Sequence, residues 1–260
     1  MKWPLETRRQ ILAACRNDIP YPESAETFGV PRGTIAYWVH LDRVQRGKPA
    51  PPRPSSCPLC DGLPIDRASY SYLLGQYLGD GHIISKRKQH HLSIYCCDGW
   101  PGVLAEVEAA MLAVMPAYRI GRHQKPGCTE VKSYSMHWKC LFPQHGPGMK
   151  HARQIVLHPW QQQLVAEHPW PLIRGLIHSD GCRVVNWTTA RLADGSTKRY
   201  EYPRYIFTNK SDDVRRIYSS ALDTVGVDWR VSKRGPDPYH VSVARRASVA
   251  LMDEHIGAKY

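Results

Sequence analysis

The spacing of apolar and polar residues divides residues 65–260 into two similar halves. In the first half, helical and alternating periods predict a helix, a strand, a second helix and another strand, at 66–81, 91–96, 101–115 and 134–140. Asp66 is a favourable N-terminal cap for the first helix, and Gly81 ends that helix. The first half, residues 65–160, therefore alternates helices with strands.

The second half, residues 161–260, repeats this order. A helix opens at Pro171 and ends at Gly181, one hundred positions after Gly81. Further along come a strand, a helix and two more strands, at 204–207, 211–226, 229–231 and 240–243. The pair Asp194-Gly195 predicts the turn of a longer first hairpin in this half. We expect each half to run helix, two strands, helix, two strands and a closing helical segment.

Residues 1–46 show only helical patterns, which we expect at 9–14, 22–28 and 32–39, with a turn at 29–31. The segment AETFGVPRGTIAYWV resembles the helix-turn-helix of bacterial regulators and recombinases. By that resemblance the start of the third helix contacts DNA bases through Arg32, Thr34 and Tyr37. A helical cap or a dimerisation module is the alternative.

Residues 47–64 are rich in proline and polar residues, as in a semi-rigid spacer between domains. This spacer contains Cys57 and Cys60 in a CxxC pair, which is half of a structural zinc site. The chain has no second CxxC pair, and the adjacent Cys96 and Cys97 form a poor chelate, although one of them could join if the fold brings it near. Ordinary reduced thiols are the alternative to zinc.

The composition, with 42% apolar residues, is that of a soluble globular protein. The sequence shows neither a long apolar span nor a secretory signal, so we expect an intracellular protein, cytoplasmic and bound to the nucleoid when on DNA. Lysine and arginine exceed aspartate and glutamate by 35 to 23, which favours binding to a polyanion. A basic enzyme without nucleic acid is the alternative. The sequence has no nucleotide-binding phosphate loop and no HExxH metal motif.

The two repeated helices each carry small residues four positions apart, Gly75 with Gly79 and Gly175 with Ser179. Such residues form a flat stripe, which lets two helices pack closely. If the helices pack along these stripes, their C-terminal ends lie side by side.

Each of these ends carries an aspartate, Asp80 or Asp180. A carboxylate at a helix C-terminus is unfavourable by a few tenths to about 1 kcal/mol, and two neighbouring carboxylates repel each other. Shared divalent cations relieve this repulsion, and acids around Mg²⁺ in a basic protein indicate phosphodiester hydrolysis. A plain Asp-Gly helix end is the alternative for each motif taken alone.

The segments LLGQYLGDG (73–81) and IRGLIHSDG (173–181) resemble two copies of the LAGLIDADG motif of homing endonucleases. The resemblance implies an α+β fold, with two pseudo-symmetric αββαββ halves forming a saddle on the DNA major groove. It places Asp80 and Asp180 at the metal-binding acids, with Gly79 and Ser179 beside them, and implies Mg²⁺ or Mn²⁺. The sixth motif position, often Asp in the family, is Leu78 in one copy and His178 in the other.

The implied activity is metal-dependent cleavage of both strands of a long DNA site, leaving 3′ overhangs, by a monomer without an obligatory protein partner. Relatives place a basic catalytic residue on the later strands of each half; by order along the chain, the candidates are Lys139 and Arg245 or Arg246. Residues expected on the saddle to contact DNA, some of which could be solvated strand positions, are His91, Ser93, Tyr95, Lys132, His137, Arg230 and Lys233. A non-cleaving transcriptional regulator built on the same scaffold is the main alternative, and an RNA maturase is another.

Overall fold

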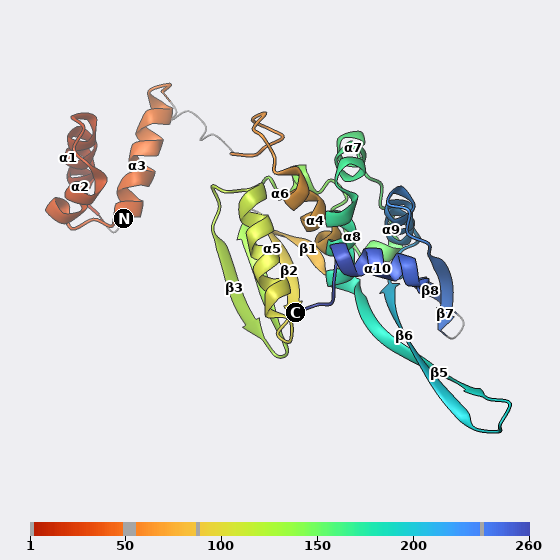
Figure 1. The fold of residues 1–260 in the computed structure, drawn as a ribbon. Coiled ribbons are helices and arrows are strands. Elements are labelled where there is room, and N and C mark those ends of the chain that lie inside the picture. The colour runs from red at the N-terminus through yellow and green to blue at the C-terminus, as the bar shows by residue number, and fades with distance from the viewer. Residues whose placement is uncertain (1–2, 49–55, 87–88, 235–236) are drawn as a thin grey trace. The chain divides into compact units, whose positions relative to one another are not determined.

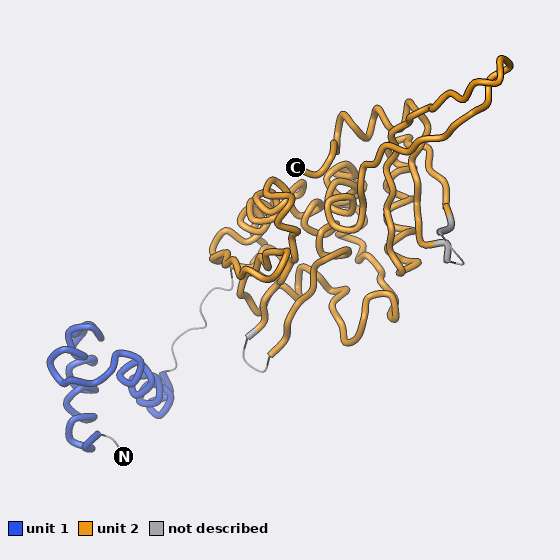
Figure 2. Tube along the Cα trace, turned by 90° about the horizontal axis from the view of Figure 1, so that it is seen from below, with its two compact units in different colours: residues 1–54 blue, residues 55–260 orange. Residues whose placement is uncertain are grey.

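The computed structural model of the chain describes residues 3–48, 56–86, 89–234 and 237–260. Its residues form two compact units, 1–54 and 55–260, which are shown in separate colours in Figure 2. Each unit has its own apolar core and is described by itself. No helix among the described residues is long and apolar enough to cross a membrane.

The N-terminal unit consists of three helices: α1 (Leu5–Arg16), α2 (Tyr21–Phe28) and α3 (Arg32–Gln45). The three helices expected from the sequence are therefore confirmed. Ile11, Ile35 and Val39 meet in a small core because they lie on the inner faces of α1 and α3. Gly29 ends α2 with a φ of 63°, a left-handed conformation that glycine adopts without strain. This residue allows the sharp turn from α2 into α3.

The second unit contains two four-stranded antiparallel sheets with the same strand order, β1-β2-β4-β3 and β5-β6-β8-β7. The first sheet comprises β1 (Gly81–Lys86), β2 (Gln89–Cys97), β3 (Ile120–Lys125) and β4 (Cys128–Tyr134). The second comprises β5 (Gly181–Arg191), β6 (Thr197–Thr208), β7 (Arg230–Arg234) and β8 (Asp237–Val243). The two halves inferred from the sequence therefore have the same strand topology.

The helices of this unit are α4 (Arg67–Leu78), α5 (Pro101–Val114), α6 (Trp138–Leu141), α7 (Pro159–Glu167), α8 (Pro169–Asp180), α9 (Asp212–Thr224) and α10 (Arg246–His255), with a 3₁₀ turn η1 (Lys150–Ala152). Figure 1 shows α4 and α8 side by side at the centre, with α5 over the first sheet and α9 and α10 beside the second. The core continues through both halves, so that they form one folded body. The double αββαββ architecture expected from the sequence is therefore confirmed.

Two local predictions have different outcomes. The strand expected at 134–140 is wrong: β4 ends at Tyr134, and residues 138–141 form the short helix α6. The side chain of Trp138 is fully buried and its indole nitrogen donates to the Ser133 carbonyl at 2.9 Å, which fixes the turn that begins the helix. The turn at Asp194-Gly195 is confirmed, with Gly195 at a φ of 82° joining β5 to β6.

Candidate functional site

Helices α4 and α8 approach so closely that glycine is required where they cross. A Cβ atom at Gly175 would lie 2.1 Å from the Tyr72 carbonyl oxygen, and one at Gly75 would lie 2.6 Å from that of Leu172. At the helix ends, a Cβ at Gly79 would lie 2.1 Å from the Ser179 hydroxyl. The small-residue stripes therefore face each other along the contact, as the sequence predicts.

This packing brings the two ends that carry Asp80 and Asp180 together. A Cβ at Gly79 would lie 3.3 Å from the carboxyl carbon of Asp180, so Asp180 lies beside the end of α4. The surrounding protein and the charge of Asp180 raise the pKa of Asp80 to about 6. Burial also raises the pKa of Asp180, against the opposing effect of a 2.5 Å hydrogen bond from Asn209. Two acidic groups are therefore gathered at one point where their ionisation is unfavourable.

Two lysines from distant parts of the chain supply positive charge at these ends. The Nζ of Lys150, on η1, donates to the carbonyl oxygens of Tyr77 at 2.6 Å and Gly81 at 2.8 Å, and also to that of Gly79. The Nζ of Lys259 donates to the Ser179 carbonyl at 3.0 Å. Each helix end thus has its own lysine.

The charges of these lysines act on both aspartates and lower their pKa values. Burial in turn lowers the pKa of Lys150 to about 8 and lowers that of Lys259 in the same direction. The sequence offers no motif around Lys150 or Lys259 that marks them. Only the fold places residues some 70 to 80 positions away beside the motif ends.

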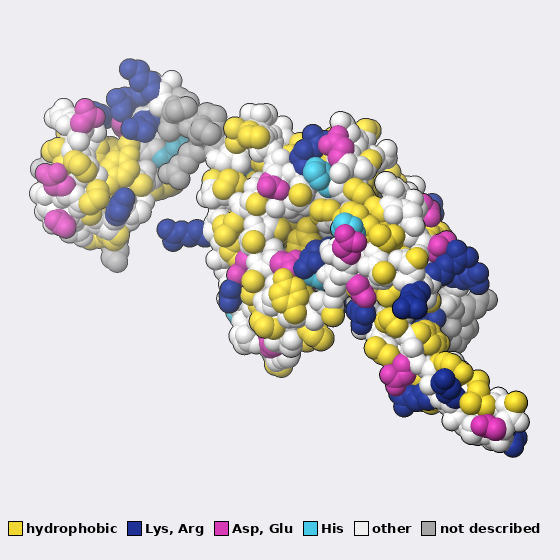
Figure 3. Space-filling model, viewed as in Figure 1, with side chains coloured by type: hydrophobic (Ala, Val, Ile, Leu, Met, Phe, Trp, Pro, Cys, Tyr) yellow, Lys and Arg dark blue, Asp and Glu magenta, His cyan; other side chains and the backbone are white. Residues whose placement is uncertain are grey.

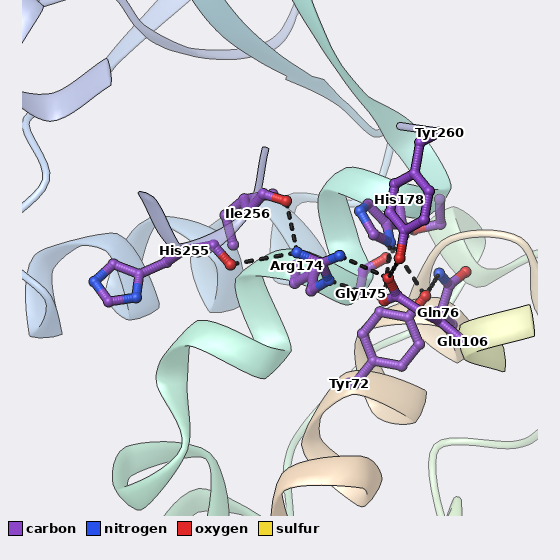
Figure 4. Close-up of polar contacts among 10 residues, drawn as sticks. Tyr72, Gln76, Glu106, Arg174, Gly175, His178, His255, Ile256 and Tyr260 are labelled. Carbon is purple, nitrogen blue, oxygen red and sulfur yellow. Dashed lines mark hydrogen bonds and ion pairs between the residues drawn. The ribbon is translucent and has the colours of Figure 1, made fainter. Parts of the chain in front are cut away.

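A polar cluster along α4 and α8 fixes the two helices to α5 and to the last residues of the chain (Figure 4). The Arg174 guanidinium donates to both carboxylate oxygens of Glu106, at 2.9 and 2.6 Å, and to the Ile256 carbonyl at 2.6 Å. The Tyr260 hydroxyl also donates to Glu106. These contacts hold the segment that carries Lys259 against the helix pair.

His178, at the motif position where the family often has Asp, belongs to this cluster. Its Nδ1 lies 3.1 Å from the Tyr72 hydroxyl and 3.7 Å from a Glu106 oxygen. Burial lowers its pKa to about 4, so the imidazole is neutral near pH 7. His178 therefore takes part in helix packing rather than in the acidic pair.

The first sheet presents one apolar face to the core and one polar face. Leu92 and Ile94 point into the core, so the alternating residues His91, Ser93 and Tyr95 point to the opposite face. The register places Lys132 on β4 opposite Ser93 on that same face. These residues share one face of the sheet, but His91 and Ser93 are buried there, and only Tyr95 and Lys132 are partly exposed.

An internal network on this face is centred on Glu130, which accepts from Ser93 and lies 3.4 Å from Lys125. Burial opposes ionisation of Glu130, but the Ser93 hydrogen bond and the Lys125 charge outweigh it, so its pKa lies below the usual value. Lys125 in turn donates to the Tyr95 hydroxyl at 2.9 Å. Ser93 and Tyr95 are therefore held by neighbours within the sheet.

The second sheet continues the polar face with arginines. Arg230 on β7 lies opposite Ser242 on β8, which in turn lies opposite Ile206 on β6. These three residues share the face of the sheet that is opposite the buried Phe207 and Val241. Strands β5 and β6 extend beyond the body as a long hairpin (Figure 1). Figure 3 shows Lys and Arg side chains along this hairpin. Here the guanidinium of Arg199 lies 4.9 Å from the ring of Trp187, which is 58% exposed.

The same arrangement of helices and strands occurs in solved structures. A variant of the homing endonuclease I-DmoI aligns with a TM-score of 0.50 and 13% identity, over 73% of this chain and 90% of that one. Residues 55–260 have the LAGLIDADG fold. I-DmoI with DNA and Mn aligns at 0.49 and 13% identity, over 75% and 98% of the two chains. The N-terminal LAGLIDADG domain of WhiA aligns at 0.45 and 9%, over 75% and 83%. No known family description matches the sequence, and no curated protein does.

Within the LAGLIDADG fold, the basic residues expected on the later strands occupy other places. Lys139 lies on α6, Arg245 is the residue before α10, and Arg246 begins α10, so the expected strand positions are wrong. The side chain of Arg245 contacts Asp228 at 3.0 Å. The lysines whose charges act on Asp80 and Asp180 are instead Lys150 and Lys259.

The remaining candidates stay predictions. His137 precedes α6 and lies beside two cysteines. Lys233 lies in β7, and its side chain lies outside the described part of the structure. In the N-terminal unit, Arg32 and Tyr37 are exposed at the start of α3, and Thr34 is partly exposed.

Proposed function

We propose that this protein is a metal-dependent endonuclease that cuts both strands of a specific double-stranded DNA site and leaves 3′ overhangs. The observation that carries the proposal is the acidic pair, Asp80 and Asp180, at the adjacent ends of two interlocked helices. Two carboxylates with raised pKa values, each beside a lysine, form an arrangement that contributes nothing to packing. Such perturbed groups gathered at one point indicate a functional site.

The residues at this point suit a hard divalent cation such as Mg²⁺ or Mn²⁺. Asp80 and Asp180 would hold it with carboxylate oxygens, and the carbonyl oxygens of Gly79 and Ser179 would complete an all-oxygen set. Each of those two carbonyls accepts a hydrogen bond from a lysine ammonium group, so an ion would use the second lone pair of the oxygen. When bound, the ion activates water and stabilises the leaving 3′ oxygen.

Lys150 and Lys259 would provide the basic groups of the two halves. Each ammonium group lies at a motif end, where its positive charge would stabilise the negative charge that develops during cleavage. We assign these roles to Lys150 and Lys259 in place of Lys139 and the arginines at α10.

The polar sheet faces would hold the duplex. Lys132 and Arg230 lie on the polar faces of the first and second sheets, and basic side chains follow the long β5–β6 hairpin. Arginine and lysine on these surfaces suit phosphate contacts, whereas the partly exposed Tyr95 suits a contact with a base edge. One chain carries both halves, so we propose a monomer.

The test is cleavage of a randomised double-stranded DNA library in Mg²⁺ by the wild type and by Asp80→Asn and Asp180→Asn. We expect defined products with 3′ overhangs from the wild type and a loss of about 10²–10³-fold or more in each variant. Asp18→Asn is the matched control, because Asp18 is exposed in the N-terminal unit and its φ of 61° suits asparagine. Selective binding of one site without cleavage would instead identify a non-cleaving regulator.

A further inference from the structure

A second group of metal-binding side chains lies away from the acidic pair. Cys57 and Cys60 precede α4, while His137 and Cys140 lie at and within α6, about 80 residues later. One donor atom from each of the four lies within 4.8 Å of every other. The sequence shows only the first pair as a motif, because the second pair is His-x-x-Cys rather than CxxC.

The distances fit a tetrahedral ion. Zn²⁺ binds sulfur at about 2.3 Å and nitrogen at about 2.0–2.1 Å, which separates neighbouring ligand atoms by about 3.5–3.8 Å. The Cys60 sulfur lies 3.4 Å from Nδ1 of His137 and 3.5 Å from the Cys140 sulfur. The Cys140 sulfur lies 3.7 Å from the same Nδ1. A disulfide requires about 2.05 Å, so the cysteines are spaced as ligands rather than as a bonded pair.

The turn that carries the first two cysteines is preformed. The backbone amide of Cys57 donates to the Asp61 carboxylate at 2.9 Å, and the Asp61 amide donates back to the Cys57 carbonyl at 3.0 Å. The backbone amides of Cys60 and Leu59 lie where they hydrogen-bond to the Cys57 sulfur. Metal-bound thiolates are commonly stabilised by such outer hydrogen bonds.

The second ligand pair is also held by its surroundings. The His137 amide donates to the Ser135 hydroxyl at 3.1 Å, and the Cys140 amide donates to the His137 carbonyl at 2.9 Å. The buried Trp138 between them anchors α6 in the core. Cys96, which the sequence leaves as another potential ligand, is instead buried in the core of the first half.

We propose that Cys57, Cys60, His137 and Cys140 bind one structural Zn²⁺. Three thiolates and an imidazole form a closed tetrahedral set without a place for substrate, which is the arrangement of structural rather than catalytic zinc. The ion would link the segment before α4, which carries Cys57 and Cys60, to the segment after β4, which carries His137 and Cys140. His137 is then a metal ligand and not a DNA contact.

The zinc content of the full chain, purified and dialysed against metal-free buffer, tests the site. We expect about one zinc per chain in the wild type and in Cys97→Ser, which alters an exposed cysteine outside the cluster. Cys60→Ser and Cys140→Ser should each lose the zinc. The protein loaded with Co²⁺ should show the thiolate charge-transfer absorption of a tetrahedral site, and this absorption should disappear in the same two variants.

Two results would overturn the proposal. One is a wild-type protein that retains no zinc, including the case in which thiol titration finds a disulfide in its place. The other is zinc that persists in the double variant Cys60→Ser/Cys140→Ser. Limited proteolysis adds a readout that does not depend on nuclease activity: removal of zinc should expose the segment 56–65 to cleavage while the rest of the second unit stays resistant.

Discussion

At the scale of single residues, the acidic pair and Lys150 each lie in surroundings that disfavour their charged forms. Desolvation by the surrounding protein opposes the ionisation of Asp80 and Asp180, and the charge of Asp180 adds to this effect at Asp80, although Asp80 remains exposed. Burial likewise opposes the charge of Lys150. Each group is less favourable here than it would be in water, and together they partly compensate one another. A protein selected for stability alone would replace them with neutral side chains.

The first prediction follows from this conflict. Because the pKa of Asp80 rises from 3.8 to about 6 on folding, its ionised form destabilises the fold, and stability is lost as pH rises through that window. Without metal, we expect Asp80→Asn to raise the free energy of unfolding at pH 7 by about 1 kcal/mol, a value that allows for solvent screening of an accessible side chain. This corresponds to a rise in Tm of about 2–4 °C.

Thermal melts across pH check this prediction. The difference between Asp80→Asn and the wild type should be small below pH 4 and reach its full value above pH 6, whereas Asp18→Asn should follow the wild type throughout. An Asp80→Asn protein that is less stable than the wild type at pH 7 would show that the carboxylate stabilises the fold.

At the scale of elements, the contact between α4 and α8 sets the position of the acids. Carbonyl groups of one helix lie where the other has only a glycine hydrogen, at Gly75 and Gly175. The backbones of these helices cannot yield as a flexible side chain would, so extra volume must separate them. Such a separation would also move Asp80 away from Asp180.

We therefore expect Gly175→Ala to lower the free energy of unfolding by about 1–3 kcal/mol and to reduce cleavage more than DNA binding. Urea denaturation and cleavage at saturating DNA provide the two readouts. Gly99→Ala is the control, because a Cβ at Gly99 would meet only the Cys97 sulfur at 3.7 Å, an ordinary van der Waals contact. A fully stable and active Gly175→Ala protein would contradict the close packing.

Elements and motifs that repeat along the chain could be predicted, and contacts between distant segments could not. The stripe Gly75–Gly79 and the acids are local features of sequence, and the αββαββ order follows from periodicity. The lysines at positions 150 and 259 have no local signature, because their role comes from the tertiary path of η1 and of the last residues. The strand predicted at 134–140 is wrong because the buried Trp138 overrides the alternation of this segment.

At the scale of the whole molecule, two compact units share one chain. The N-terminal unit exposes Arg32 and Tyr37 on the helix that the sequence resemblance assigns to base contacts. The second unit carries the acidic pair and both sheets. We infer that affinity for DNA is divided between the units, whereas cleavage chemistry belongs to the second.

The double variant Arg32→Ala/Tyr37→Ala should therefore weaken binding to the cognate site by about tenfold or more and leave the rate at saturating DNA unchanged. Titration of DNA binding and single-turnover cleavage separate these quantities. Arg9→Ala is the matched control, because Arg9 is an exposed arginine on α1. Unchanged affinity in the double variant would assign the N-terminal unit a different role.

The two lysines have one more consequence, because they are not equivalent. Lys150 contacts three carbonyl groups from an internal turn, whereas Lys259 contacts one from the segment that follows α10. The pseudo-symmetry of the fold is therefore broken beside Asp80 and Asp180. Under the proposed activity, the two scissile phosphates therefore lie in different electrostatic surroundings, and one DNA strand is cut faster than the other. An intermediate duplex that is nicked in that strand should accumulate before the double-strand break.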